Sequence, residues 1–278
     1  MMMNRRAFVA GAGALAAAST LGGIARAAQI RKIGLQLYTV REIFQSDPVD
    51  TLEKVARIGY REVEYGGGNY DTMDHALLRK TMDRLHLTSP SLHIPYDTLL
   101  NRFGDAVKMA KTLGADTIVV PWLPEELRAE AAFAGVVENV NRFAKQARGA
   151  GLGLAYHNHD FEFLNRSGGT SLYDKLVDGT DPSLVKLELD LYWAVHAGQD
   201  AGKLIDRLGT RLYAFHAKDM KADRSMAAVG TGTIDFAALF KRPGAAKVQH
   251  FYVENDEAQA PYLPDITTSF KNLRALRF

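Results

Sequence analysis

Four short apolar runs in the C-terminal half of the chain each end in a residue that can bind a metal ion. Their candidate ligands are His157, Asp190, His216 and Glu254, in the segments LGLAYHNHD, LVKLELDLYW, LYAFHAKD and VQHFYVENDE. Intervals of 33, 26 and 38 residues separate these ligands, and each interval has room for one strand, one helix and two loops. Such units form the wall of a (β/α)8 barrel, in which the C-terminal strand ends carry the active site.

The same alternation of strand-like and helix-like segments continues through the rest of the chain. It predicts strands at residues 32–40, 60–65, 88–94, 117–121, 152–157, 185–191, 212–217 and 251–254. It predicts helices at residues 48–58, 74–85, 99–113, 129–148, 171–177, 201–208, 236–240 and 265–276. Eight strand–helix pairs without a Pro/Ser-rich linker predict a single (β/α)8 TIM barrel and favour it over an open doubly wound sheet.

The first 27 residues are expected to be an export signal rather than part of the barrel. Arg5 and Arg6 precede an uncharged Ala/Gly-rich stretch, and Ala25-Arg26-Ala27 offers a cleavage site. This pattern resembles a twin-arginine signal, which predicts a periplasmic or secreted protein with a mature domain at 28–278. The alternative is a retained anchor, but membrane spans are usually richer in Leu, Ile, Val and Phe.

Composition limits the partners of the mature chain. Three of the 34 basic residues lie in the predicted signal and none of the 32 acidic residues does, so the mature chain has a net charge of −1. This balance gives no support for nucleic-acid binding, and no apolar span remains after processing. The absence of Cys rules out thiol ligands and thiol nucleophiles, and no Gly-x-Gly-x-x-Gly supports dinucleotide binding. The oligomeric state stays open, with a homo-oligomer as one option.

The strand-end residues predict a metal centre. Side chains alternate along a strand, so His157 shares a face with His159, Glu188 with Asp190, and His216 with Lys218. We expect at least three of the four candidate ligands to bind one divalent ion, which could be Mn, Co, Mg, Zn or Fe.

Several of these segments resemble a known family. YHNHDFEF, LELDLYWAVHAG, FHAKD, VGTGTIDF and YVEND are similar to motifs of the xylose isomerase-like, or sugar phosphate isomerase/epimerase, TIM barrels. The resemblance implies that a Glu-Asp-His-Glu set holds one divalent metal and that its two Glu act as acid and base on sugar carbons. Asp190, His216 and Glu254 match three of these positions. The fourth position differs from the family pattern, because this chain has His157 where the family often has Glu.

This departure puts the two-glutamate proton exchange in doubt and leaves the identity of the base open. Glu254, Glu162 and His159 are the candidates, and the alternative for Glu162 is an exposed loop acid. Four further residues are expected to contact the substrate: His93, Trp193, Lys218 and Gln36. Residues 230–233, Gly-Thr-Gly-Thr, look like a phosphate cradle, but the missing Lys favours a loop that leads to an Asp235 N-cap.

The first function predicted is a metal-dependent sugar isomerase or epimerase that acts through an enediolate. The second is a lyase or hydratase of 3-keto-glycosides at the same site, which the lost Glu and the predicted export both favour. An endonuclease of the same fold would need more ligands and a DNA-binding surface. The non-enzyme alternative is a periplasmic sugar-binding barrel.

Overall fold

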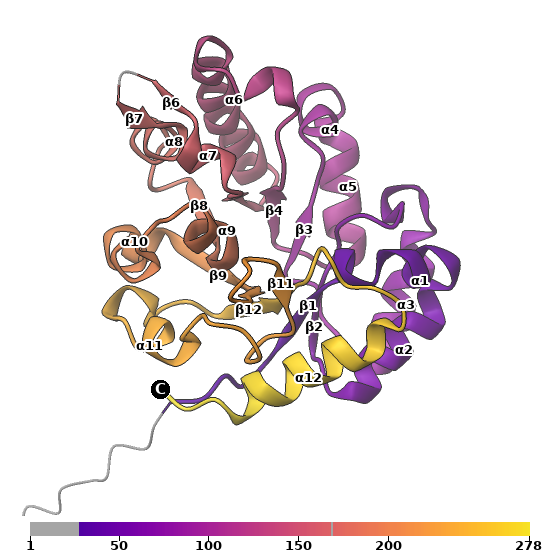
Figure 1. Cartoon of the computed structure of the whole chain (residues 1–278). Helices are drawn as coiled ribbons and strands as arrows, with labels where there is room; N and C mark the ends of the chain where they lie inside the picture. Colours follow the sequence, from indigo (N-terminus) through magenta and orange to yellow (C-terminus); the bar gives the residue numbers. More distant parts are fainter. Residues whose placement is uncertain (1–27, 168) are drawn as a thin grey trace, which may run out of the picture.

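The computed structural model describes residues 28–167 and 169–278 (Figure 1). The predicted export signal at residues 1–27 lies outside this part. The two ends of the described chain meet, because Ala28 N donates to Phe278 O at 2.6 Å and Phe278 N donates to Ala28 O at 3.1 Å. Among the helices of the described residues, none is long and apolar enough to cross a membrane.

Eight parallel strands form the centre of the molecule, with helices around them (Figure 1). Their order in the sheet is β2-β1-β12-β9-β8-β5-β4-β3. Parallel bridges from Glu62 to Thr88 and from Tyr65 to Leu92 join the two edges and close the barrel. The predicted TIM barrel is therefore confirmed. The strands are β1 (Gly34–Gln36), β2 (Glu62–Glu64), β3 (Ser91–His93), β4 (Thr117–Val120), β5 (Gly153–His157), β8 (Val185–Asp190), β9 (Leu212–Ala217) and β12 (His250–Val253).

Each barrel strand is followed by a helix of the outer layer. These are α2 (Pro48–Ile58), α3 (His75–Leu85), α5 (Phe103–Leu113), α6 (Glu130–Gly149), α8 (Leu172–Gly179), α10 (Ala201–Leu208), α11 (Phe236–Phe240) and α12 (Tyr262–Ala275). Short helices lie in the loops at the strand ends: α1 (Arg41–Ser46), α4 (Tyr96–Asn101), α7 (Phe161–Leu164) and α9 (Leu191–His196). Two small hairpins pair β6 (Arg166–Ser167) with β7 (Thr170–Ser171) and β10 (Asp219–Met220) with β11 (Met226–Ala227).

Two predicted elements differ from the structure. The strand expected at 32–40 ends at Gln36, because the Gln36 side chain accepts a hydrogen bond from Tyr38 N at 3.1 Å and the chain turns into a 3-10 helix, Leu37–Val40. The helix expected at 99–113 is two helices, because Arg102 leaves the helical conformation with φ −139°. The expected start of α2 is correct: Asp47 accepts from Asp50 N at 2.9 Å, and Pro48 occupies the first turn.

Candidate metal centre and active site

The four predicted ligands lie together at the C-terminal mouth of the barrel. His157 and Asp190 are the last residues of β5 and β8, His216 is next to last in β9, and Glu254 directly follows β12. The sheet register places Asp190 beside His216. All four side chains are buried, and one donor atom from each lies within 4.8 Å of the others. The fold thus brings residues from four separate units into one set.

The donor set suits a divalent metal ion. His157 Nε2 lies 3.8 Å from Asp190 Oδ2, and His216 Nδ1 lies 2.7 Å from Glu254 Oε2. Asp190 Oδ2 is buried and has no hydrogen-bond partner within the described chain, which leaves it available to a metal ion. Two imidazole nitrogens and two carboxylate oxygens are donors that zinc, manganese, cobalt and iron accept. This buried cluster could therefore hold a metal ion.

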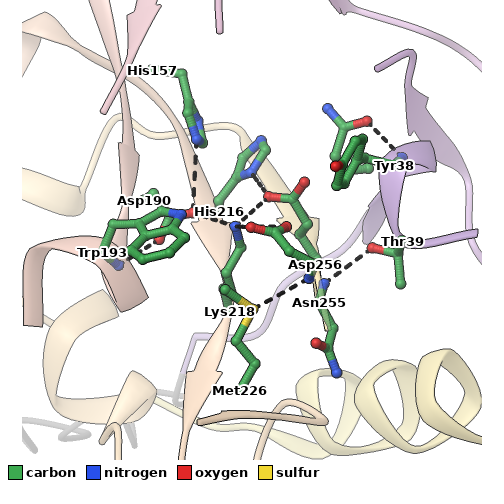
Figure 2. A network of polar contacts seen from close by, with 12 residues as sticks. Tyr38, Thr39, His157, Asp190, Trp193, His216, Lys218, Met226, Asn255 and Asp256 are labelled. Atoms are coloured by element: carbon green, nitrogen blue, oxygen red, sulfur yellow. Dashed lines mark hydrogen bonds and ion pairs between the residues drawn. The ribbon is translucent and has the colours of Figure 1, made fainter. Parts of the chain in front are cut away.

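Lys218 is a second cation among these carboxylates. Its Nζ lies 3.1 Å from Asp190 Oδ2, 2.8 Å from Glu254 Oε2 and 3.0 Å from Asp256 Oδ2. The contact with Asp190 is an ion pair without hydrogen-bond geometry. Figure 2 shows the lysine between Asp190 and Asp256. Burial disfavours the ammonium, but the three carboxylates outweigh it and raise the pKa of Lys218 well above its usual value. Lys218 therefore stays charged and holds these carboxylates in place.

Glu188 and Glu64 hold the opposite nitrogens of the ligand imidazoles. His157 Nδ1 lies 3.1 Å from Glu188 Oε1, and His216 Nε2 lies 3.0 Å from the same oxygen. His216 Nε2 is also 2.8 Å from Glu64 Oε2. Each imidazole thus directs one nitrogen to the ligand set and the other to a carboxylate. This arrangement orients metal-binding histidines and fixes which nitrogen carries the proton.

His93 contacts the same two carboxylates, Glu188 and Glu64. Its Nε2 lies 2.8 Å from Glu188 Oε1 and 3.1 Å from Glu64 Oε2. Burial works against the charged ring, but the two carboxylates outweigh it and raise the pKa of His93 to about 9. Gln36, which is predicted to contact the substrate, is fully buried and donates to Glu64 Oε2 at 2.9 Å.

A cavity of about 520 Å³ opens above the ligand set. Among the predicted site residues, those that line it are His93, His157, His159, Trp193 and Glu254. Burial, reinforced by His157, lowers the pKa of His159 well below its usual value, so this ring is neutral. Lys218 and Gln36 do not line the cavity.

Glu162 lies away from the cavity and is buried, not exposed in a loop. It accepts hydrogen bonds from Tyr156 Oη at 2.9 Å and from His159 N at 2.8 Å. Burial raises the pKa of Glu162 to about 8. Its carboxyl group therefore supports the turn that carries His159, and its predicted role as a base stays a prediction.

Sequence reasoning gave no role to several residues of the site. Glu188, Glu64 and Asp256 were recognisable only as acids near strand ends, since their partners lie on other strands. Trp122 lies two residues beyond β4 and lines the cavity. The sequence signal that could have identified Trp122 is an aromatic residue shortly after a predicted barrel strand.

The glycine-rich segment 230–233 encloses a carboxylate of the protein itself. Gly230 N and Gly232 N donate to Asp219 Oδ2 at 2.9 and 2.8 Å, and Ile234 N donates to Asp219 Oδ1 at 3.1 Å. A Cβ at Gly232 would lie 2.4 Å from Asp219 Oδ1, so glycine is required there. Asp235 accepts from Ala238 N at 3.0 Å as the expected N-cap. The segment is a structural loop.

Known proteins of similar sequence and structure share this barrel. An inosose dehydratase of Clostridium perfringens is 23% identical over 229 residues, which cover 68% of this chain and 75% of that protein. A sugar phosphate isomerase/epimerase from Parabacteroides distasonis superposes with a TM-score of 0.75 at 25% identity, covering 89% of this chain and 95% of the other.

A more distant structure, the IOLI protein with a bound zinc atom, has a TM-score of 0.67 at 16% identity and covers 87% of this chain and 96% of its own. That likeness shows the fold alone. The family model of the xylose isomerase-like TIM barrel matches residues 52–253, most of the chain. The chain belongs to the xylose isomerase-like TIM barrel family.

Proposed function

We propose that the protein is a metal-dependent lyase or dehydratase that acts on a keto-sugar or a cyclic keto-polyol. The observation that carries the proposal is the unequal distribution of acid–base groups around the cavity. Carboxylates line it after β12, at Glu254 and Asp256, whereas the end of β5 presents the imidazoles of His157 and His159. These strands are separated by β9 and β8 in the barrel, so the two kinds of group lie on different sides of the mouth.

This distribution suits β-elimination. A carboxylate, with Glu254 as the predicted base, takes the proton from the carbon next to the carbonyl. The C–O bond at the following carbon then breaks, its electron pair leaves with the oxygen, and a C=C bond forms. His159 is neutral and its Nδ1 has no hydrogen-bond partner within the described chain, so its ring can hydrogen-bond the departing oxygen. A divalent cation held by His157, Asp190, His216 and Glu254 would supply Lewis acidity toward the substrate oxygens.

The relatives support both this reaction and a second candidate. The proteins named inosose dehydratase favour loss of an oxygen substituent. The Parabacteroides protein, named a sugar phosphate isomerase/epimerase, favours return of the abstracted proton to the same or the neighbouring carbon. Isomerisation or epimerisation through two carboxylates requires a second carboxylate across the cavity from Glu254, and at the end of β5 His157 stands where the family often has Glu. We therefore rank elimination first.

The test combines metal analysis with proton exchange. Protein purified without chelator is assayed for its metal content and then incubated in D2O with keto-sugars, 3-keto-glycosides and inosose, followed by NMR. Deuterium exchange with release of the β-substituent is expected. Exchange with a new isomer and no release would support the isomerase or epimerase. Binding without exchange of any C–H would identify a sugar-binding barrel instead.

A matched variant separates the base from the binding site. Glu254→Gln keeps the shape of the side chain but cannot accept the proton. In variant protein whose metal content matches that of the wild type, we expect a far larger loss of kcat than of substrate affinity. Equal losses of both would mean that Glu254 only binds the substrate or the metal, and would remove it as the base.

A further inference from the structure

In the described chain, histidines are the only side chains lining the cavity that can carry a positive charge. Of the residues that line it within the described chain, none is Lys or Arg, whereas Asp71, Glu254 and Asp256 are acidic. Lys218 is buried and already contacts three carboxylates. A phosphate dianion beside the candidate ligands would lie next to carboxylates. Recognition of phosphate normally uses Arg, Lys or free backbone amides.

Two backbone segments near the mouth already have partners for their amides. Gly230 N, Gly232 N and Ile234 N all donate to Asp219. The N-terminus of α9 is capped by Asp190, which accepts from Trp193 N at 2.9 Å. Neither segment offers amides to an anion. Among the lining residues of the described chain there is also no Lys or Arg to hold the phosphate of a sugar.

Exposed aromatic rings lie at the cavity instead. Trp122 and Tyr38 both line it, although 47% and 38% of their surfaces are exposed. An arginine stacks on each: Arg128 lies 4.0 Å from the centre of the Trp122 ring, and Arg41 lies 4.3 Å from that of Tyr38. Stacked guanidinium groups hold the rings in place. Large exposed aromatic residues at a pocket commonly mark a binding surface.

Two buried polar atoms at the cavity also lack a hydrogen-bond partner within the described chain. Trp193 Nε1 and His159 Nδ1 are buried, and neither has a hydrogen-bond partner in the described chain. Both residues line the cavity. Sugar hydroxyls can satisfy such atoms, since a hydroxyl donates and accepts. The cavity thus has an inner polar region beside the candidate metal ligands and an outer aromatic region. Its volume of about 520 Å³ falls among pockets that hold ligands larger than one sugar ring.

We propose that the substrate is an uncharged glycoside whose second ring, a sugar or an aglycone, stacks on Trp122 and Tyr38, and that phosphorylated sugars are excluded. This inference rests on the proposed function for the identity of the reacting ring. That ring lies in the inner region, where Trp193 and His159 hydrogen-bond its hydroxyls. The second ring lies toward solvent, where the aromatic faces replace water.

The test measures binding, not turnover. Intact metal-loaded protein is titrated with the phenyl glycosides, the free sugars and the 6-phosphates of glucose, galactose and mannose, followed by saturation-transfer NMR. At least one phenyl glycoside should bind about tenfold more tightly than its free sugar. Trp122→Ala should remove this difference. Leu77→Ala is the matched control, because Leu77 is also exposed (46%) but lies outside the cavity.

The outcomes separate this inference from the proposed function. Equal or tighter binding of the 6-phosphates, an unchanged preference in Trp122→Ala, or no binding of any of these compounds would overturn the glycoside inference. If the glycoside inference fails in this way but the protein still exchanges protons with a keto-monosaccharide, the proposed function is supported. A preference for phenyl glycosides that depends on Trp122, without proton exchange on any keto-substrate, would support the glycoside inference and contradict the proposed function.

Discussion

At the scale of single residues, the candidate metal centre draws its donors from separate strands. His216 and Asp190 come from adjacent strands, and each supplies one donor to the set. We expect His216→Ala and Asp190→Ala to reduce the metal content from close to one per chain to near zero, measured by elemental analysis. Circular dichroism should show a folded barrel in both variants.

His250→Ala is the control for these substitutions. His250 also lies in a barrel strand and pairs with a carboxylate, Glu62, at 2.9 Å, but it begins β12 at the other end of the barrel. This variant should keep its metal. Full retention of metal in His216→Ala and Asp190→Ala alike would show that the ion, if bound, lies elsewhere.

Glu188 is predicted to act through the two histidines it contacts. Its Oε1 lies 3.1 Å from His157 Nδ1 and 3.0 Å from His216 Nε2, so it fixes the ring orientation and leaves the other nitrogens for the metal. Glu188→Gln should weaken metal affinity by about 10–100-fold, measured by competition with a chelator. Ring-nitrogen NMR of the metal-free variant should show altered tautomers. Unchanged affinity and spectra would reduce Glu188 to a packing role.

Glu162 is expected to make stability depend on pH. Its pKa is raised from 4.5 to about 8 by burial, so the folded state keeps a proton that the unfolded chain releases. The stability contributed by the neutral carboxyl is fully present below about pH 4.5 and is lost as the pH rises through about 8. Between these values the free energy of unfolding should fall by about 1.4 kcal/mol per pH unit relative to Glu162→Gln, measured by urea unfolding.

The exposed Glu126→Gln serves as a control, and its stability should follow the wild type at every pH. Parallel curves for the wild type and Glu162→Gln would mean that the carboxyl is ionised in the folded protein. Enzyme assays of the same variant address the predicted base: near-normal turnover in Glu162→Gln would remove Glu162 from the chemistry.

At the scale of elements, hydrophobic periodicity identified strands and helices better than it located their ends. The strands at 212–217 and 152–157 and the helix at 201–208 were predicted to within a residue, because apolar alternation and capping residues are local signals. The break at Arg102 was missed, since the apolar pattern continues through it. The early end of β1 was missed because it follows from one hydrogen bond of the Gln36 side chain.

The loop around Asp219 offers a prediction at this scale. A Cβ at Gly232 would approach Asp219 Oδ1 and Met220 O, both at 2.4 Å, so the loop must shift and release the buried carboxylate. Gly232→Ala should lower the free energy of unfolding by roughly 1–3 kcal/mol, measured by thermal denaturation. Gly135→Ala, in the middle of α6 with nothing within 4 Å, should be neutral or stabilising. Equal effects of the two would contradict this account of the loop.

At the scale of the whole molecule, the sequence could predict which strand-end residues come together but not the network of carboxylates around them. Each ligand follows its own strand, and the eightfold pattern implies that all strand ends meet. The contact of His216 with Glu64 joins residues 152 positions apart. It depends on how β1 and β12 lie between β2 and β9, which no local pattern encodes. The cavity wall likewise depends on loops whose paths are set by tertiary contacts.

Export is the remaining prediction at this scale, and it concerns residues outside the described part. The ligand set exists only in the folded barrel, because its donors come from four strands. A twin-arginine route passes folded proteins and so fits a metal centre assembled before export. We propose that replacing Arg5-Arg6 by Lys-Lys traps the precursor in the cytoplasm, measured by cell fractionation. Arg26→Lys makes the same change outside the arginine pair and should export normally. Unchanged export of the Lys-Lys variant would indicate the general secretion route, in which the metal is acquired after folding on the far side of the membrane.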